Sequence, residues 1–97
     1  MNNAIIIEPA DNVAVAIEPI RRGETVSWSL PDGTISSLTA QEDIPVYHKL
    51  AIRSIAAGEK IIKYGEHIGE ASTAIPAGSH VHVQNVASVR EQLTEEE

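Results

Sequence analysis

The chain has 97 residues, a net charge of −7 and no cysteine, and its aromatic residues are one Trp and two Tyr. The lack of cysteine excludes disulfides, thiolate zinc sites and a cysteine-held iron–sulfur cluster within this chain. Its acidity, together with basic residues that are scattered without interleaved aromatics, argues against binding to nucleic acid. Because no long apolar run stands out, we expect a cytoplasmic protein without membrane contact.

With so few aromatic side chains, the core has to be built from Ile, Val, Leu and Ala, which favours short strands over large amphipathic helices. A chain this short buries about two-thirds of its unfolded surface. We therefore expect one small, irregular all-β domain over residues 1–86. Residues 87–97 are predicted as an acidic tail or the start of a linker, with a short helix over 87–93 as the alternative for its first part.

The predicted strands of the first half follow one another closely. Ala4–Glu8 is a short apolar run, and Val13–Ile17 alternates with the period of two that is typical of a strand. Thr25–Leu30 and Thr34–Leu38 are predicted to pair as a hairpin around the tight turn Pro31–Gly33. This half is thus expected to consist of strands joined by tight turns.

The second half is expected to continue in the same way. Residues 47–55 fit neither the strand period nor the helix period cleanly, and we predict them as extended. Residues 60–71 indicate two short strands around a turn near Gly65. Gly69 is predicted to mark a bulge or a close approach by another backbone.

One short pattern occurs three times: an isoleucine, two spacers, a glycine, two further residues and a β-branched residue. The copies are Ile20–Val26, Ile55–Ile61 and Ile75–Val81. The glycine can take the positive-φ turn position that a Cβ disfavours, and the β-branched residue restarts an extended segment. The third copy continues through His80 and His82, whose imidazoles would lie on the same face of a strand.

Four motifs occur in the order found in a known family. They are Asp11–Ala16, Tyr47–Ala51, Ile62–Gly69 and Ala77–Asn85. Together they resemble the small N-terminal domain, or separate small subunit, of altronate/galactarate dehydratases, to which the small subunits of sulfolactate sulfo-lyases are similar. The resemblance covers nearly the whole predicted domain and implies a β-clip fold of the SAF type. It also implies a large catalytic subunit or domain as partner and a sugar acid as substrate.

The reaction that the resemblance implies removes a weakly acidic proton beside a carboxylate and expels hydroxide from the neighbouring carbon. A divalent metal ion assists by neutralising developing negative charge, and a base of near-neutral pKa takes the proton. Clustered histidines without cysteine suit a mononuclear site, for which Fe(II) is our first choice and Mn(II) or Zn(II) are alternatives. Elimination of sulfite from sulfolactate would follow the same logic.

We expect His80 and His82 to bind the metal, and His48 and His82 to act in catalysis, with a further ligand role open to His48. The structural alternative for the paired histidines is a hydrogen bond across strands. Gln84 stands where members of the family commonly carry a third alternating histidine. If the family uses such a row of three as ligands, this chain lacks one of them, because an amide is a poor ligand for iron or zinc.

Four further residues are candidates for contacts with the substrate: Lys49, Lys63, Tyr64 and Asn85. The ammonium and phenol groups would bind a carboxylate, and the asparagine would bind the substrate through its amide. Each has a structural alternative. Lys49 with His48 would be an exposed pair at a bend, Lys63 and Tyr64 would form a turn, and Asn85 would cap a strand.

We interpret the chain as the small subunit or N-terminal domain of a metal-dependent sugar-acid dehydratase, inactive on its own. Substrates of the altronate type are our first choice, because residues 11–16 and 62–65 resemble those members. The alternatives are a non-catalytic module that binds sugar acids or gates the partner's site, an assembly domain that holds a homo-oligomer together, and the small subunit of a sulfolactate sulfo-lyase.

Overall fold

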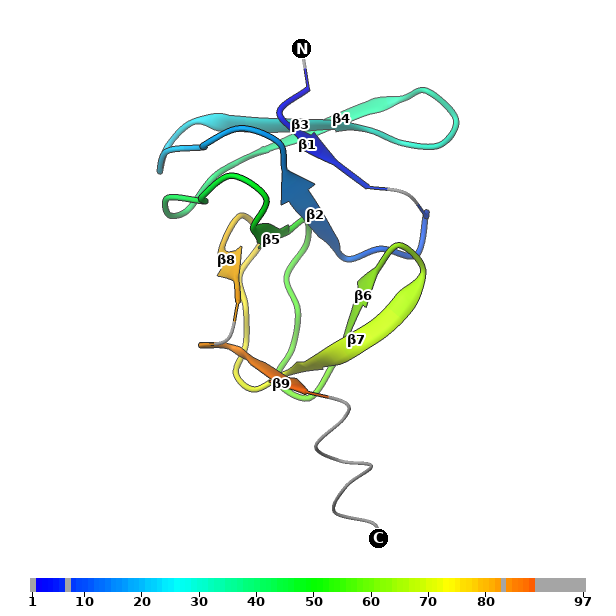
Figure 1. Cartoon of the computed structure of the whole chain (residues 1–97), viewed down its shortest axis with the longest axis vertical. Helices are drawn as coiled ribbons and strands as arrows, with labels where there is room; N and C mark the ends of the chain where they lie inside the picture. Colours follow the sequence, from blue (N-terminus) through cyan, green and yellow to red (C-terminus); the bar gives the residue numbers. More distant parts are fainter. Residues whose placement is uncertain (1, 7, 83, 89–97) are drawn as a thin grey trace, which may run out of the picture.

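The computed structural model describes residues 2–6, 8–82 and 84–88, and these residues form short strands and no helix, hence none that could cross a membrane (Figure 1). In chain order the strands are β1 (Ala4–Ile5), β2 (Val13–Ala16), β3 (Thr25–Ser29), β4 (Ile35–Thr39), β5 (Lys49–Ala51), β6 (Lys60–Lys63), β7 (Glu66–Ala71), β8 (His80–Val81) and β9 (Val86–Ser88). The expectation of a small all-β domain is confirmed. Residues 87 and 88, which a terminal helix would include, instead end β9, and residues 89–97 lie outside the described part of the chain.

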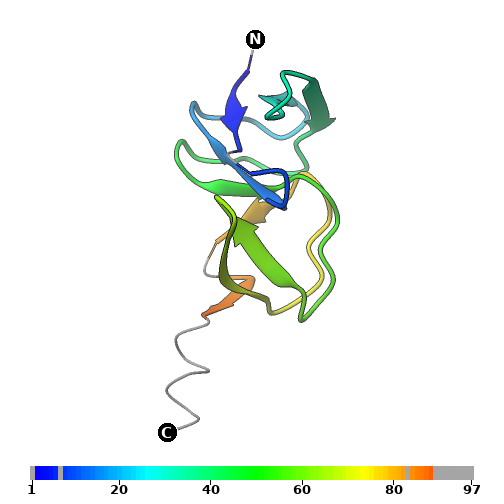
Figure 2. The same ribbon diagram turned by 90° about the vertical axis from the view of Figure 1, so that its right-hand side faces the viewer.

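All strand pairs are antiparallel. They form a sheet in the order β1-β2-β5-β8, a hairpin of β3 and β4, and a sheet in the order β6-β7-β9. In Figure 1 the β3–β4 hairpin lies across one end, the four-stranded sheet lies in the middle and the β6–β7–β9 sheet lies beyond it. Figure 2 shows the same succession from the side. Because β5 pairs with both β2 and β8, the middle of the chain lies between segments from near its two ends.

The repeated pattern forms turns, and the structure contains a fourth copy that has no glycine. In the three predicted copies the glycine has a φ between 86° and 90°. The fourth copy is Ile44–Leu50, in which Tyr47 takes the place of the glycine with a φ of 69°, and Leu50 replaces the β-branched residue. In every copy the N–H of the fifth residue donates to the carbonyl of the second, at 2.9–3.1 Å, which closes a turn of type II around the positive-φ residue.

The four copies pair two by two, and each begins four residues after a buried alanine. An isolated bridge joins Ile20 to Ile44, and another joins Ile55 to Ile75. Within each pair, the positive-φ residue of one copy donates its N–H to the alanine before the other copy, at 2.7–2.9 Å: Gly23 to Ala40, Tyr47 to Ala16, Gly58 to Ala71 and Gly78 to Ala51. The domain therefore consists of two halves with the same pattern of turns.

Each half has its own hydrophobic cluster. The first cluster contains Trp28 and Leu50, and the second contains Ile61 and Val81. Asn12 ties β2 to the second half, because its buried side-chain amide bonds the backbone of β6 at two points, at 2.7 and 2.8 Å. A small chain with few aromatics thus obtains most of its core from aliphatic side chains, and the buried amide of Asn12 is hydrogen-bonded through both its nitrogen and its oxygen.

Gly69 on β7 confirms the expected close approach by another backbone. A Cβ at this position would lie 2.7 Å from the carbonyl oxygen of Ala87 and 2.7 Å from Cγ1 of Val86, both on β9. The register of β6 against β7 also shifts between Ile61 and Ile62, as expected of a bulge. A side chain at residue 69 would therefore push β9 away from the sheet.

Candidate functional site

Three histidines from two distant parts of the chain come together at one edge of the four-stranded sheet. His48 immediately precedes β5, His80 begins β8, and Leu50 lies opposite His80 where these strands pair. His82 follows β8 directly. The ring centroids are 4.5 Å apart for His48 and His82, 5.0 Å for His48 and His80 and 5.5 Å for His80 and His82, and the rings are stacked. The shared face of His80 and His82 is confirmed, and His48 completes what we call the histidine trio.

The histidine trio has the donor set and the spacing for a metal ion. One ring nitrogen from each residue lies within 4.8 Å of the others, and Nδ1 of His48 is 2.8 Å from Nε2 of His80. Metal–nitrogen bonds of about 2.0–2.1 Å place neighbouring ligand nitrogens roughly 3–3.4 Å apart, which falls within this range. Three imidazoles bind Zn(II) or Fe(II) and leave coordination positions open. The residues present therefore fit a divalent metal.

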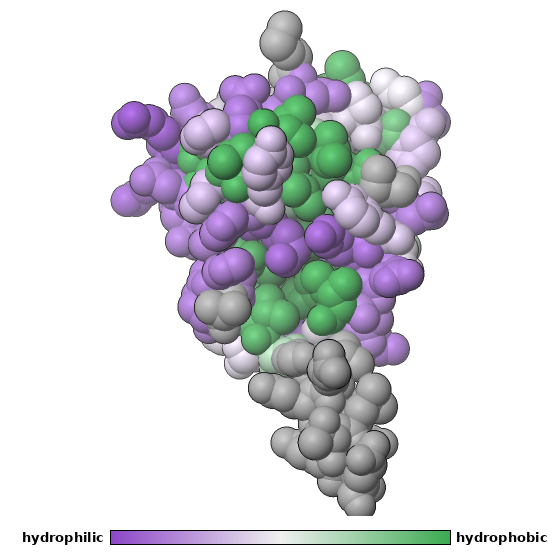
Figure 3. Space-filling view, viewed as in Figure 1, coloured by the Kyte–Doolittle hydropathy of each residue, from purple (hydrophilic) through white to green (hydrophobic). Residues whose placement is uncertain are grey.

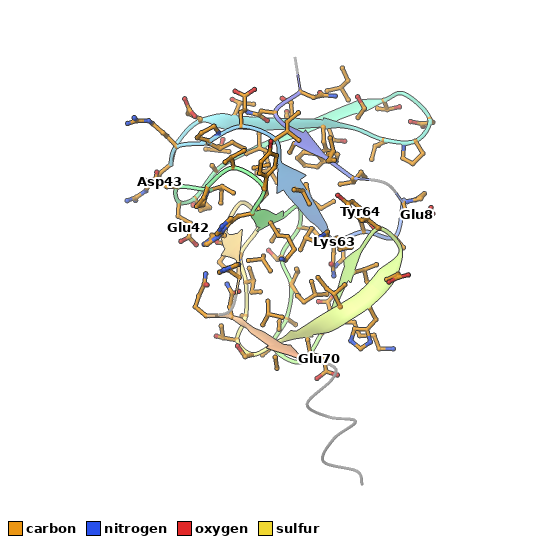
Figure 4. The ribbon with its side chains drawn as sticks, in the orientation of Figure 1. Glu8, Glu42, Asp43, Lys63, Tyr64 and Glu70 are labelled. Carbon is orange, nitrogen blue, oxygen red and sulfur yellow. The ribbon has the colours of Figure 1, made fainter. Side chains whose placement is uncertain are left out.

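Electrostatics favours the neutral form of His80, which is the form that binds a metal. Burial lowers the pKa of His80, and charge on the neighbouring rings of His48 and His82 lowers this pKa further. The carboxylate of Glu42 acts in the opposite direction on the same pKa. Glu42 also accepts a hydrogen bond from the backbone N–H of His80 at 3.2 Å, and Figure 4 shows it beside β8.

Asn85 holds the loop that carries His80 and His82. Its Oδ1 accepts a hydrogen bond from the N–H of His82 at 3.0 Å, and its Nδ2 donates to the carbonyl of His80 at 2.9 Å. Asn85 is buried, so the structure gives it a positioning contact, and its contact with substrate stays a prediction. Nε2 of Gln84 lies 3.4 Å from Nδ1 of His80. The third imidazole beside His80 and His82 is that of His48.

Lys49 lies on the other face of the sheet from the histidine trio. Its cross-strand partners are Val15 and Val81, whereas His80 is aligned with the next residue of β5. Since successive side chains of a strand point to opposite faces, Lys49 and His80 point away from each other. Burial lowers the pKa of Lys49, and the charge of Lys63 lowers this pKa further.

Lys63 and Tyr64 form the turn between β6 and β7. The ammonium of Lys63 lies 5.0 Å from the ring centroid of Tyr64, and Tyr64 has a φ of 56°. Figure 4 shows both residues well to one side of β5, away from Glu42. Lys63 and Tyr64 therefore lie apart from Glu42, whereas the charge of Lys49 is close enough to His80 to lower its pKa. The contact of all three residues with a substrate stays a prediction.

The sequence predicts His48 as a catalytic residue with a ligand role left open, and Glu42 is not among the predicted site residues. The signal for His48 was the fourth copy of the turn pattern, which aligns the start of β5 with the start of β8. For Glu42 no sequence signal exists, because its contact with His80 joins residues 38 positions apart.

Comparisons with known proteins match nearly the whole chain. The family model of the altronate/galactarate dehydratase SAF domain matches residues 2–89. The chain is 33% identical over 93 residues to (2R)-sulfolactate sulfo-lyase subunit alpha of Chromohalobacter salexigens, which covers 93% of this chain and 99% of that subunit.

Two altronate dehydratases match a similar stretch of the chain. The enzyme of Bacillus subtilis is 37% identical over 86 residues, and that of Escherichia coli is 42% identical over 81 residues, covering 88% and 84% of this chain. The chain spans only 16% and 15% of the length of these two enzymes. With a family model that matches almost its whole length, the chain belongs to the altronate/galactarate dehydratase SAF-domain family.

Proposed function

We propose that this chain is the small subunit or N-terminal domain of a cytoplasmic, metal-dependent sugar-acid dehydratase of the altronate/galactarate type. In this proposal the histidine trio contributes a divalent metal site to an active site that a large catalytic subunit or domain completes. The observation that carries the proposal is the convergence of three imidazoles in a domain whose relatives are dehydratases and lyases. The chain alone is expected to be inactive.

When bound, an Fe(II), Mn(II) or Zn(II) ion would neutralise the charge that develops on the substrate and on its departing hydroxide. His80 and His82 would hold the ion, and Asn85 would keep their backbone in place through its two hydrogen bonds. Two roles are open to His48, that of a third ligand and that of the proton acceptor. Its Nδ1 lies against His80, which favours the ligand role. His82 has the same choice, because one nitrogen cannot bind a metal and accept a proton together.

Lys49 and Lys63, with Tyr64 beside Lys63, would attract the substrate carboxylate. The two ammonium groups supply positive charge for this task in a chain whose net charge is −7. A phenol next to Lys63 can donate a hydrogen bond to the same carboxylate.

The test compares wild type with a His80→Ala/His82→Ala variant, each assembled with the large subunit. Metal content and turnover of altronate, galactarate and sulfolactate are measured. We expect the variant to lose metal and its rate to fall by orders of magnitude while the complex still assembles. Unchanged metal and rate in an assembled complex would refute the proposal and favour a non-catalytic binding, gating or assembly module.

Two single variants complete the design. His48→Ala separates the two roles of this residue, because loss of metal identifies a ligand and a low rate with metal retained identifies proton transfer. His67→Ala is the matched control, since this histidine lies on β7 outside the trio. Its metal content and rate are expected to equal those of wild type.

A second candidate is the small subunit of a sulfolactate sulfo-lyase. The match over 99% of the length of subunit alpha from Chromohalobacter salexigens favours it. The same residues would then serve the expulsion of sulfite in place of hydroxide. Turnover of sulfolactate, without turnover of altronate or galactarate, would decide for this candidate.

A further inference from the structure

Tyr47 is in a conformation that the other three copies of the turn pattern reserve for glycine. Its φ is 69°, where a Cβ costs about 1–2 kcal/mol relative to the ordinary helical region. Within the chain little offsets this cost, because the Tyr47 side chain is 75% exposed. A glycine would close the same turn without the strain, as Gly23, Gly58 and Gly78 do.

Three further exposed apolar residues lie on β1, just after β2 and directly before this tyrosine in the chain. Ile5 is 37% exposed, Ile17 41% and Val46 36%. Tyr47 donates its N–H to the carbonyl of Ala16 at 2.7 Å, which places it beside Ile17. Figure 3 shows apolar side chains gathered over β1 and β2 on the face that it presents. We call these four residues, Ile5, Ile17, Val46 and Tyr47, the Tyr47 surface.

The position of the Tyr47 surface links it to the histidine trio. Tyr47 is bonded directly to His48, and the turn that strains Tyr47 also places His48, whose N–H donates to the carbonyl of Pro45 at 3.0 Å. A body that covers the tyrosine therefore lies next to the turn that carries His48. Large exposed aromatics are typical anchors of protein interfaces, because they bury much area at a small entropic cost.

The comparisons indicate what this body is. In two altronate dehydratases the matching stretch is 16% and 15% of the length of the enzyme. In the sulfo-lyase it is nearly the whole of a subunit designated alpha. The dehydratases supply a much larger remainder of the same chain, and the designation alpha implies a further subunit in the sulfo-lyase. We propose that the Tyr47 surface is where the large catalytic subunit or domain docks, with Tyr47 as its anchor, an inference that rests on the proposed function. A partner docked here lies next to the turn that carries His48.

The test uses the opposite effects that a Tyr47→Gly substitution should have on stability and on association. The variant removes strain, so the melting temperature of the chain should rise by about 2–5 °C. It also removes the anchor, so the Kd for the separately produced large subunit, measured by calorimetry, should increase at least about 10-fold. Ile17→Ser should weaken association as well.

The matched control is Ile35→Ser, because Ile35 is 63% exposed on β4, outside the Tyr47 surface. Its Kd should stay within about twofold of wild type, since truncation of most residues outside such an anchor cluster costs little. A Tyr47→Gly chain that binds as tightly as wild type would overturn the assignment of this surface and leave the proposed function intact. A lowered melting temperature would show that the ring packs within the chain, which also overturns it. A wild-type chain that binds no large subunit would instead refute the proposed function.

Discussion

Replacing Gly78 by alanine should destabilise the domain far more than the same change at Gly58. Both residues occupy the same position of the turn pattern, with φ values of 89° and 86°. A Cβ at Gly58 meets nothing within 4 Å, whereas a Cβ at Gly78 collides with the carbonyl oxygen of Thr39 and lies 3.2 Å from Cγ of Gln41. Gly78 also accepts a hydrogen bond from the N–H of Gln41 at 2.9 Å, so the collision falls where the two halves meet.

The two substitutions share the positive-φ strain, which costs about 1 kcal/mol of unfolding free energy after the change in unfolded-state entropy. The collision with backbone adds about 1–3 kcal/mol for Gly78→Ala, as overpacking does elsewhere. The free energy of unfolding of a domain of this size is roughly 5–15 kcal/mol in total, so Gly78→Ala removes a large part of it.

Urea unfolding followed by the fluorescence of Trp28 measures both effects. Trp28 is the single tryptophan and is 4% exposed, so its emission reports on the first hydrophobic cluster. With a slope of about 1–2 kcal/mol per M, the midpoint of Gly78→Ala should lie roughly 0.5–3 M below that of Gly58→Ala. Equal midpoints would refute the reasoning that the close contact of Gly78, beyond its φ, holds the halves together.

Three further outcomes are expected. Burial and the other two rings lower the pKa of His80. The folded chain therefore takes up a proton at His80 less readily than the unfolded chain, in which the pKa of histidine is about 6.5. The contribution of His80 to the free energy of unfolding is therefore fully present above about pH 6.5 and is lost as the pH falls through the folded pKa. Between about pH 7.5 and pH 5.5 the urea midpoint should fall less in His80→Gln than in wild type. Asn85→Ala loses two hydrogen bonds in the loop and should lower the free energy of urea unfolding by about 1–2 kcal/mol. It should also weaken metal binding in a titration, and an unchanged metal affinity would count against the positioning role of Asn85. Asn12→Ala leaves two backbone groups of β6 without their partner and should cost about 2–3 kcal/mol by the same assay, and a loss below about 1 kcal/mol would contradict this account.

Features that depend on local chemistry could be predicted from the sequence. The turns at the three glycines of the repeat follow from the freedom of glycine at positive φ, and the structure has all three there. The hairpin between residues 25 and 39 follows from alternation around a tight turn, and it is present as β3 and β4. Gly69 was predictable because a glycine inside a strand pattern indicates a bulge or a close neighbour.

Features that depend on pairing between distant segments could not be predicted in the same way. The contact between His48 and His80 spans 32 residues and arises only because β5 pairs with β8. The fourth copy of the turn was obscured because Tyr47 has the φ of a glycine without being one. The same pairing shows that Lys49 and His80 lie on opposite faces of the sheet. Alternation within β5 alone does not reveal this.

The central claim is that His48, His80 and His82 bind a divalent metal. The most direct measurement is anomalous scattering at the Fe, Mn and Zn absorption edges from crystals of the chain assembled with its large subunit. We predict one peak bonded to a ring nitrogen of each of the three histidines, at about 2.0–2.1 Å for Zn. A metal held by the large subunit alone, with the three rings still stacked and hydrogen-bonded as they are here, would contradict the claim.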